Sequence, residues 1–356
     1  MKRTFVFFAA LAASAYFTAS IHPQNTQQSE FTDSDIPPEY EYIDETEINK
    51  KVSDWGFSVS PVSGFKYGTI GEYVFEKNKT GGRYKLSELQ WDTKPEFFLG
   101  TDWMLRWKFL RLTSNVQFGL PAKSGTMSDS DWRNGANGDT DTKTNYSESD
   151  NKITTATDFN IKMLTDFPCS NLFTFSPYIG FEIDYTNMLA TGGWGKYGNE
   201  NSEKTGYDSW DSGNVTEHYW SDDEKVIEYN RIGYYVWTGC GVTFNGPVIP
   251  LHFYFCASTA PYVYMFSKDT HFLKNIYFID ITDGWFNLWQ FEGRISYTFS
   301  KHWSAYIDAS YIFSGIYKGA DYYSTSSDGE YIPLSDESGT DVKNMQFKLG
   351  VTFIFF

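Results

Sequence analysis

A histidine and an aspartate two residues apart are the first candidates for chemistry. Asp269 and His271 stand in the segment Asp-Thr-His. In extended backbone this spacing puts both side chains on one side, about 6.6 Å apart along the chain. The carboxylate can then orient the imidazole and stabilise its protonated form. The pair predicts a general acid–base site, although a solvated loop is the simpler interpretation of the pair taken alone.

A second acidic pair has the same spacing. Asp129 and Asp131 stand in the segment Ser-Asp-Ser-Asp-Trp. By itself the pair reads as an acidic surface loop in an acidic protein. Carboxylates that crowd together raise one another's pKa values, so a cluster of them could share protons.

The order of the predicted strands brings the two pairs together. They follow the third and the seventh of about ten strands, which run in the same direction and lie four strands apart. In a closed barrel the pairs therefore face each other across one mouth. Two aspartates opposite an Asp–His pair can hold a water molecule, and the imidazole can take its proton as the water attacks a peptide carbonyl.

Strand alternation sets a condition on this site. On the third strand the apolar outward residues have even numbers up to Phe118, so the Asp129 pair points inward. On the seventh strand the apolar residues have odd numbers, as Phe253 does, so the His271 pair would point outward. We therefore predict a β-bulge between them, with Pro261 as the candidate position.

The sequence contains no other familiar catalytic machinery. It has no HExxH or comparable zinc spacing, no GxSxG elbow and no phosphate-binding glycine loop, so we expect no metal and no cofactor. The segment 138–141 is an incomplete calcium loop, and a solvated loop is the preferred interpretation. Of the three cysteines, Cys240 and Cys256 could pair across a hairpin, but small apolar strand residues are the favoured interpretation.

The elements that must carry these residues are strands of a membrane barrel. Aromatic residues make up 19% of 356 residues, whereas the net charge of −16 and the polar loops resemble a soluble protein. Aromatic girdles with a polar lumen account for both features, and a disordered acidic chain would lack the aromatics. In the predicted strand 284–299, residues 289–299 alternate between an apolar face that includes Gly293 and a polar face. No run of about 18 apolar residues offers a helical span.

We predict an all-β fold, an antiparallel transmembrane β-barrel of about ten strands with long extracellular loops. The predicted strands are 56–77, 84–103, 108–122, 151–164, 172–195, 225–244, 249–267, 284–299, 303–319 and 342–356. Polar loops are expected at 78–83, 123–150, 197–224, 268–283 and 320–341. A barrel of this size is too narrow for a porin channel, so function is expected at the outer mouth.

The N-terminal region predicts export. Lys2 and Arg3 precede a short apolar run and small residues, so residues 1–20 read as a cleavable signal peptide rather than a membrane anchor. Residues 21–52 read as a flexible acidic periplasmic segment. The barrel is expected to occupy residues 53–356.

At these residues the chain resembles the omptin family of outer-membrane aspartate/histidine endoproteases. Its Asp-x-Asp-Trp and Asp-x-His segments match 129–132 and 269–271 here. The first two strands are also similar to the family's, in 72–74, 81–83 and 87–91. The similarity covers roughly residues 56–356.

The resemblance implies a surface endopeptidase without metal or covalent intermediate. Asp129 and His271 would flank the attacking water, with Asp131 and Asp269 supporting them. Glu72 matches an acid that binds a basic substrate residue, while Ser267 stands where the family has a second acid. The family's lipid-binding basic residues have no counterpart in 184–188, so dependence on lipopolysaccharide is not expected.

Two functions follow as hypotheses. The first is an outer-membrane endopeptidase whose active site faces outward and cuts polypeptides near basic residues. The second is a non-enzymatic adhesin or scaffold barrel, which would have no need of the complete Asp/His set. Expected partners are cationic polypeptides, outer-membrane lipid and the barrel assembly machinery, with no nucleic acid.

Overall fold

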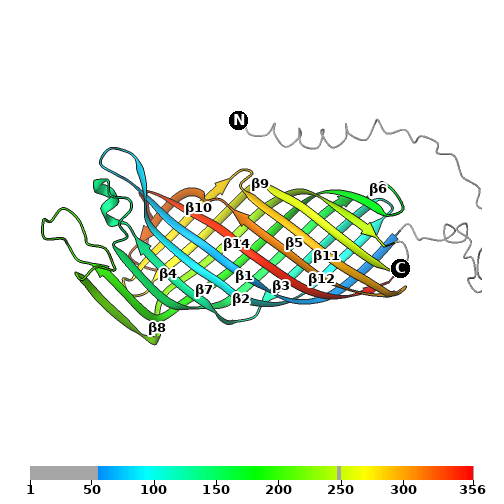
Figure 1. Cartoon of the computed structure of the whole chain (residues 1–356), viewed down its shortest axis with the longest axis horizontal. Coiled ribbons are helices and arrows are strands. Elements are labelled where there is room, and N and C mark those ends of the chain that lie inside the picture. Colours follow the sequence, from blue (N-terminus) through cyan, green and yellow to red (C-terminus); the bar gives the residue numbers. More distant parts are fainter. Residues whose placement is uncertain (1–54, 247–249, 356) are drawn as a thin grey trace, which may run out of the picture. The chain divides into compact units, whose positions relative to one another are not determined.

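A single antiparallel sheet closes on itself in the computed structural model, which describes residues 55–246 and 250–355. Figure 1 shows the tilted strands of this barrel. The predicted signal peptide and acidic segment lie outside the described residues. The strands are β1 (Trp55–Lys77), β2 (Arg83–Trp107), β3 (Leu110–Gly119), β4 (Ala122–Asp131), β5 (Asn145–Thr165), β6 (Phe167–Pro168), β7 (Phe173–Gly198), β8 (Val215–Asn245), β9 (Leu251–His271), β10 (Ile276–Gly284), β11 (Leu288–Ser300), β12 (Trp303–Ser314), β13 (Tyr317–Ser324) and β14 (Ile332–Ile354).

The barrel wall has ten strand positions, as predicted. We call each position a stave, whether one strand or two strands in line occupy it. Three staves consist of two strands in line, namely β3 with β4, β11 with β10, and β12 with β13, because each is interrupted by two or three residues. β14 pairs with β1 and closes the ring. β6 is a short piece at a turn, and the 3₁₀ helix η1 (Arg133–Asn137) lies in the connection after β4. Within the described residues, no helix has the length and apolar character needed to cross a membrane.

The outward side chains form the predicted apolar band. Exposed aromatic and aliphatic residues alternate with lumen-facing polar ones along β11, β12 and β14. On β14, for example, Leu349 is exposed while Lys348 is buried in the lumen. The band ends near Tyr67 on β1, Leu120 before β4, Trp285 after β10 and Met345 on β14. The strand segments beyond these residues, including β4, β10 and β13, project past the lipid-facing surface.

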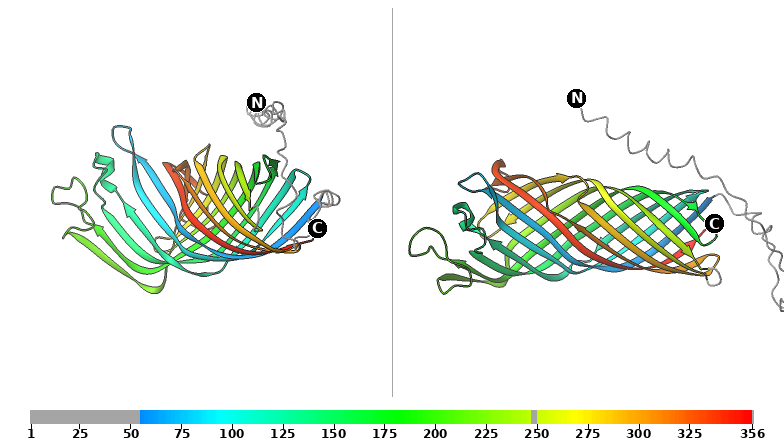
Figure 2. Two further views of the ribbon diagram at one scale, coloured as in Figure 1. Left: turned by 45° about the vertical axis from the view of Figure 1, so that its right-hand side comes forward. Right: turned by 45° about the horizontal axis from the view of Figure 1, so that its top comes forward.

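The strands extend further past this band than the sequence analysis predicted. Residues 123–131, 276–283 and 332–341 were expected in loops but form strands, so the connections shorten to 132–144, 199–214, 272–275 and 325–331. These segments lie beyond the exposed apolar band, so the apolar alternation that marks the other strands is weaker in them. Figure 2 shows the longest of the resulting hairpins, β7–β8, reaching beyond its neighbours. We call the end of the barrel with these connections the mouth.

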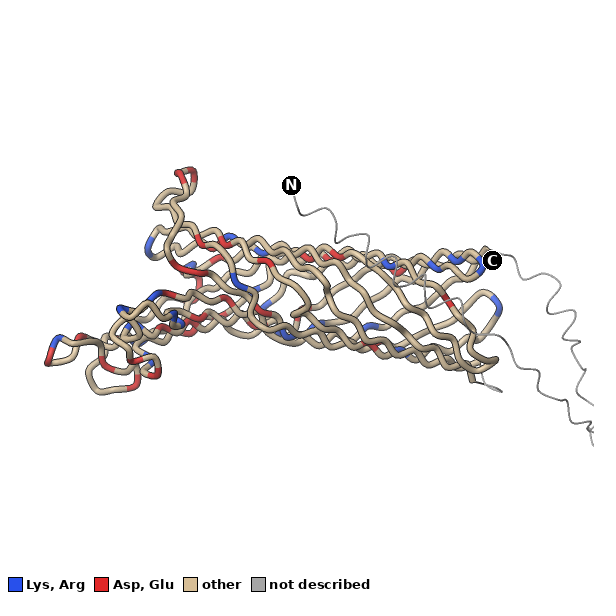
Figure 3. The backbone as a smooth tube through the Cα atoms, turned by 90° about the horizontal axis from the view of Figure 1, so that it is seen from above, with Lys and Arg blue, Asp and Glu red and all other residues tan. Residues whose placement is uncertain are grey.

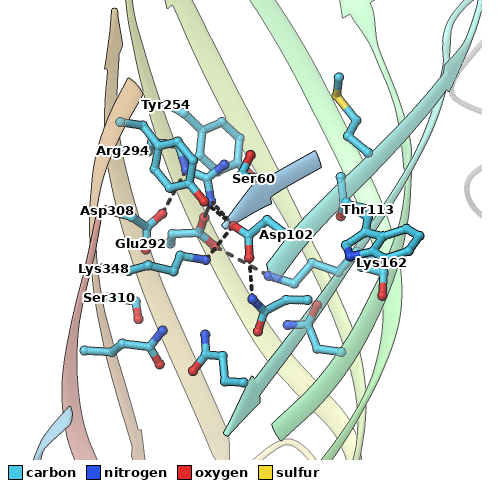
Figure 4. A pocket seen from close by; sticks show the side chains of 18 of the residues that line it. Ser60, Asp102, Thr113, Lys162, Tyr254, Glu292, Arg294, Asp308, Ser310 and Lys348 are labelled. Atoms are coloured by element: carbon cyan, nitrogen blue, oxygen red, sulfur yellow. Dashed lines mark hydrogen bonds and ion pairs between the residues drawn. The ribbon is translucent and has the colours of Figure 1, made fainter. Parts of the chain in front are cut away.

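Ion pairs fill the half of the lumen that lies within the apolar band. Lys66 Nζ lies 2.6 Å from Asp158 Oδ2, and Lys348 Nζ lies 2.8 Å from Asp102 Oδ2. Arg294 Nε lies 3.0 Å from Asp308 Oδ2. Figure 4 shows several of these side chains converging from opposite walls. They line a cavity of about 380 Å³, so this part of the interior is polar but electrically compensated.

An apolar layer separates this network from the mouth. Trp91 on β2 and Tyr229 on β8 stack with ring centroids 5.5 Å apart, and both are fully buried. Met127, Val263 and Met265 belong to the same buried cluster. Because the strands run continuously through the layer, residues beyond it are held on a rigid wall.

All three cysteines are free. In the β8–β9 register Cys256 faces Gly241, and Cys240 faces Ala257. The two sulfur-bearing residues therefore point to opposite faces of the wall, which explains why Cys240 is exposed and Cys256 buried. The favoured interpretation of these residues as ordinary strand positions agrees with this geometry.

Candidate active site

The acidic pair of β4 points into the mouth. Asp129 and Asp131 pair across the wall with Ser147 and Asn145 of β5. Asn145 Nδ2 donates to Asp131 Oδ2 at 2.8 Å, which fixes that carboxylate in place. Ser87 Oγ of β2 lies 3.5 Å from Asp129 Oδ1, a weak contact that leaves Asp129 free for another partner.

The β-bulge predicted in the seventh stave is present. Between Val236↔Tyr262 and Thr238↔Thr259, β9 contains one residue more than β8, and the extra residue falls at 260–261. Below the bulge the even-numbered Ser258 and Ala260 are buried. Above it the odd-numbered Val263, Met265 and Ser267 are buried, and Asp269 turns inward with them. The extra residue at Pro261 therefore reverses the side-chain phase that would have directed His271 toward the outside.

Asp269 and His271 form a tight pair in the mouth. His271 Nε2 lies 2.6 Å from Asp269 Oδ2, and Asp269 is only 1% exposed. The His271 ring also packs edge-on against Phe278, with centroids 5.3 Å apart. These contacts direct Nε2 at the carboxylate and leave Nδ1 as the nitrogen available to a substrate or water.

The two pairs are close enough for their charges to interact. Burial raises the pKa of Asp129 to about 7; the charge of Asp131 also raises it, while the charges of His271 and Lys274 lower it. Burial lowers the pKa of His271, but Asp269 and Asp129 outweigh this effect, and the net pKa is above the ordinary value. At neutral pH the cluster can therefore hold and exchange a proton.

A group of carboxylates that the sequence analysis missed lies beside this pair. Asp280 on β10 pairs with Ser267 of β9 on one side and with Asp321 of β13 on the other. Ser267 Oγ lies 3.4 Å from Asp280 Oδ2. The sequence analysis placed Asp280 in a loop, although the Ile-Asp-Ile alternation around it was a usable strand signal.

Glu72 completes this acidic group. Burial raises its pKa well above the ordinary value, and the charges of Asp269 and Asp280 raise it further. One oxygen each of Glu72, Asp269 and Asp321 is buried without a hydrogen-bond partner. Uncompensated buried carboxylates are costly, so the group is arranged for a positively charged ligand. Figure 3 shows acidic segments at this end of the barrel.

Other candidate residues do not join the site. Asp139 Oδ1 accepts hydrogen bonds from the backbone N–H groups of Asp141 and Thr142, so its carboxylate closes a local turn. His218 packs edge-on against Tyr197 within the β7–β8 hairpin. Within residues 55–246 and 250–355, no three His, Cys, Asp or Glu side chains are placed to hold a metal ion.

Comparisons with known proteins identify the fold and the family. The sequence model of the Omptin family matches residues 54–355. The crystal structure of outer membrane protease OmpT from Escherichia coli aligns with a TM-score of 0.72 and 14% identity, over 84% of this chain and 97% of that one. The Ail protein of Yersinia pestis aligns with a TM-score of only 0.25 and 11% identity, over 84% of this chain and 98% of that one. No match is found among curated protein sequences.

Proposed function

Since this chain belongs to the omptin family of outer-membrane endopeptidases, we propose that it cleaves polypeptides with a water molecule activated between Asp129 and His271 at the outward-facing mouth. The observation that carries the proposal is the bulge in β9. The bulge changes the side-chain phase of β9 so that Asp269 turns inward with its partner His271, and the charge of His271 acts on Asp129 of β4. An adhesin or scaffold barrel would gain nothing from burying Asp269 with an unpartnered oxygen.

The proposed reaction uses the free nitrogen of His271. Nδ1 takes a proton from water as the water oxygen bonds to the peptide carbonyl carbon, and the carbonyl electrons move to its oxygen. Asp129 accepts the second water hydrogen bond and orients the attack. The imidazolium then gives its proton to the departing nitrogen as the C–N bond breaks. Asp269 stabilises the charged ring through its 2.6 Å contact with Nε2, and Asp131 supports Asp129 from the neighbouring position.

The acidic group beside this centre supports a preference for basic residues. Glu72 and Asp280 are buried and have no Lys or Arg in ion-pair distance among the described residues. A substrate guanidinium or ammonium group would supply the missing charge. Asp280, directly across from Ser267, provides a carboxylate where the β9 position itself is neutral.

The proposed orientation follows from the strand ends. Short turns such as 301–302 lie at one end and the long hairpins at the other, as expected for periplasmic and extracellular rims. Phe353 in β14 and Phe355 directly after it are aromatic, which suits recognition by the barrel assembly machinery during insertion into outer-membrane lipid.

The test is cleavage by the refolded full-length barrel in detergent. Fluorogenic peptides with a central Arg or Lys should be hydrolysed, and mass spectrometry should place the cut beside that residue. Cleavage should disappear in Asp129→Asn and His271→Ala proteins whose far-UV circular dichroism is unchanged. A wild-type barrel that leaves a broad peptide library intact would favour the adhesin or scaffold function.

A further inference from the structure

The upper part of β8 has a free edge beside the proposed centre. The last β8–β9 pair is Ile227↔His271, whereas β8 continues on its β7 side as far as Val215↔Gly198. Within the described part of the chain, no strand pairs with residues 215–226 on the side away from β7. Phe272 N donates to Val226 O at 3.0 Å, so the free edge begins where the β9–β10 hairpin turns away.

The backbone of residues 215–220 presents unpaired groups at this edge. Asn199 N donates to Asn214 O at 3.0 Å, and no register shift interrupts the ladder from there to Trp220. In an antiparallel ladder the hydrogen-bonding direction alternates along each strand. The N–H and C=O groups of Val215, Glu217 and Tyr219 therefore point away from β7, toward solvent.

Neighbouring segments leave this edge accessible. The connection 199–214 folds onto the connection 132–144: Trp210 N donates to Lys143 O at 3.1 Å, and Asn134 Nδ2 donates to Tyr207 O at 2.8 Å. Side chains 216–219 are exposed, and Tyr219 is 74% exposed. Figure 2 shows this hairpin standing clear of the other strands.

The charges near the edge select its occupant. Acidic residues 217, 222, 223 and 224 outnumber the nearby Lys196 and Lys225. Glu217 is paired with Lys196 at 2.9 Å, while Asp222 and Asp223 are exposed. Two copies of this edge would repel each other, which protects it from self-association. A basic extended segment would be attracted instead.

We propose that the free edge of β8 binds an extended, basic segment of the polypeptide substrate as an added β-strand. The inference rests on the proposed function and deepens it. Main-chain hydrogen bonds to Val215, Glu217 and Tyr219 would hold the segment. β8 bulges at 221–224, so the β7 partners of Tyr219 and Ile227, Trp194 and Ala190, are only four residues apart, about 13 Å of strand. The bound segment therefore lies about four residues from the bond that is cut, beyond a peptide that extends only three residues to each side of that bond.

The test compares long and short substrates on a matched pair of variants. Glu217→Pro removes one edge-facing N–H, which an edge strand tolerates, and Glu217→Ala keeps it while losing the same carboxylate. For a basic 20-residue substrate, Glu217→Pro should raise KM about tenfold over Glu217→Ala. For a hexapeptide spanning only the cut, the two variants should be equal. Equal KM values on the long substrate, or equal losses on both substrates, would overturn the proposal.

A binding measurement separates this proposal from the proposed catalysis. Fluorescence anisotropy of the labelled 20-residue peptide with the Asp129→Asn barrel needs no turnover. Two versions of the peptide carry N-methyl groups on alternate amides, one in each phase. We expect one version to bind about tenfold more weakly than the other, because only one set of amides faces β8. Equal binding of both versions contradicts an added strand, even if cleavage is normal.

Discussion

The two ends of the barrel interior use the same residue types in opposite ways. Within the apolar band, the carboxylates of Asp102, Asp158 and Asp308 each have a Lys or Arg partner from another strand. At the mouth, Glu72 and Asp280 have none among the described residues, and their buried neighbours are further carboxylates.

This difference separates structure from function. A compensated network satisfies its own charges and gains nothing from a ligand. An uncompensated cluster of carboxylates lacks a positive partner until a cation or a proton binds. It therefore lowers the free energy of unfolding and leaves a site that can bind a cation. The predictions below test whether the mouth and the lumen differ in this way.

The largest effect should come from the proposed base. His271→Ala should lower kcat by about 1000-fold or more, because general-base catalysis contributes on the order of 10²–10⁴. Asp158 lies in the lumen, and its side chain is about as buried as that of His271. The Asp158→Asn variant should change kcat less than threefold. Steady-state kinetics on one Arg peptide measures both variants. Comparable losses in the two would remove the distinction between the two ends.

Stability should respond in opposite directions at the two ends. Lys348→Met leaves Asp102 without its closest cationic partner and should lower the free energy of unfolding by about 3–5 kcal/mol. Asp280→Asn should raise it. Burial raises the pKa of Asp280 in the folded state, so above about pH 4 the unfolded chain is ionised while the fold resists ionisation, and stability falls as pH rises.

Urea unfolding in detergent, followed by far-UV circular dichroism at pH 7.5, measures both changes. Asp283→Asn removes a carboxylate from the outer face of the same strand, β10, and serves as the matched control. If Asp280→Asn destabilises the barrel more than this control, the mouth carboxylates are structural rather than ligand-directed.

Substrate preference should change by a smaller factor. Asp280→Asn should lower kcat/KM for an Arg peptide about tenfold, because one charged partner is lost. A norleucine peptide should be nearly unaffected, and Asp283→Asn should leave both substrates unchanged. An equal decline for Arg and norleucine would mean that Asp280 does not contact the basic side chain.

The smallest effect concerns pH. The pKa of His271 is raised, so the base becomes protonated, and kcat/KM declines, as pH falls through a value above 6.5. Asp269→Asn removes the largest charge that raises this pKa. The acidic limb of that slower variant should therefore shift to lower pH. A wild-type profile that is flat from pH 5 to 7 is incompatible with His271 as the base.

The sequence predicted the lipid-facing half of the fold well and the mouth less well. Lipid imposes strict alternation on residues such as Trp289 and Leu349, and this signal gave ten staves in the correct order. Beyond the lipid the alternation is weaker: β10 keeps only the short Ile-Asp-Ile pattern, and the upper part of β14 is largely polar on both faces. Asp280 was missed because this short pattern was assigned to a loop, and its inward direction depends on its belonging to a strand.

One part of the candidate site could be predicted because the alternation of β9 conflicted with the Asp269–His271 pair. The odd-numbered apolar residues of β9 required His271 to face lipid, whereas its pairing with Asp269 required an interior position. A bulge at Pro261 resolves this conflict, and the register confirms it. The roles of Asp129, Asp131, Asp269, His271 and Glu72 remain predictions that depend on the proposed chemistry.

The stacked Trp91 and Tyr229 layer has a consequence for which compartment the protein senses. Both rings are fully buried and stack between the mouth and the ion-pair network. In the proposed orientation, acidification of the medium outside the cell should titrate the mouth directly, while protons from the periplasm meet this apolar layer first. The protonation state of the mouth would therefore follow the external pH rather than the periplasmic pH.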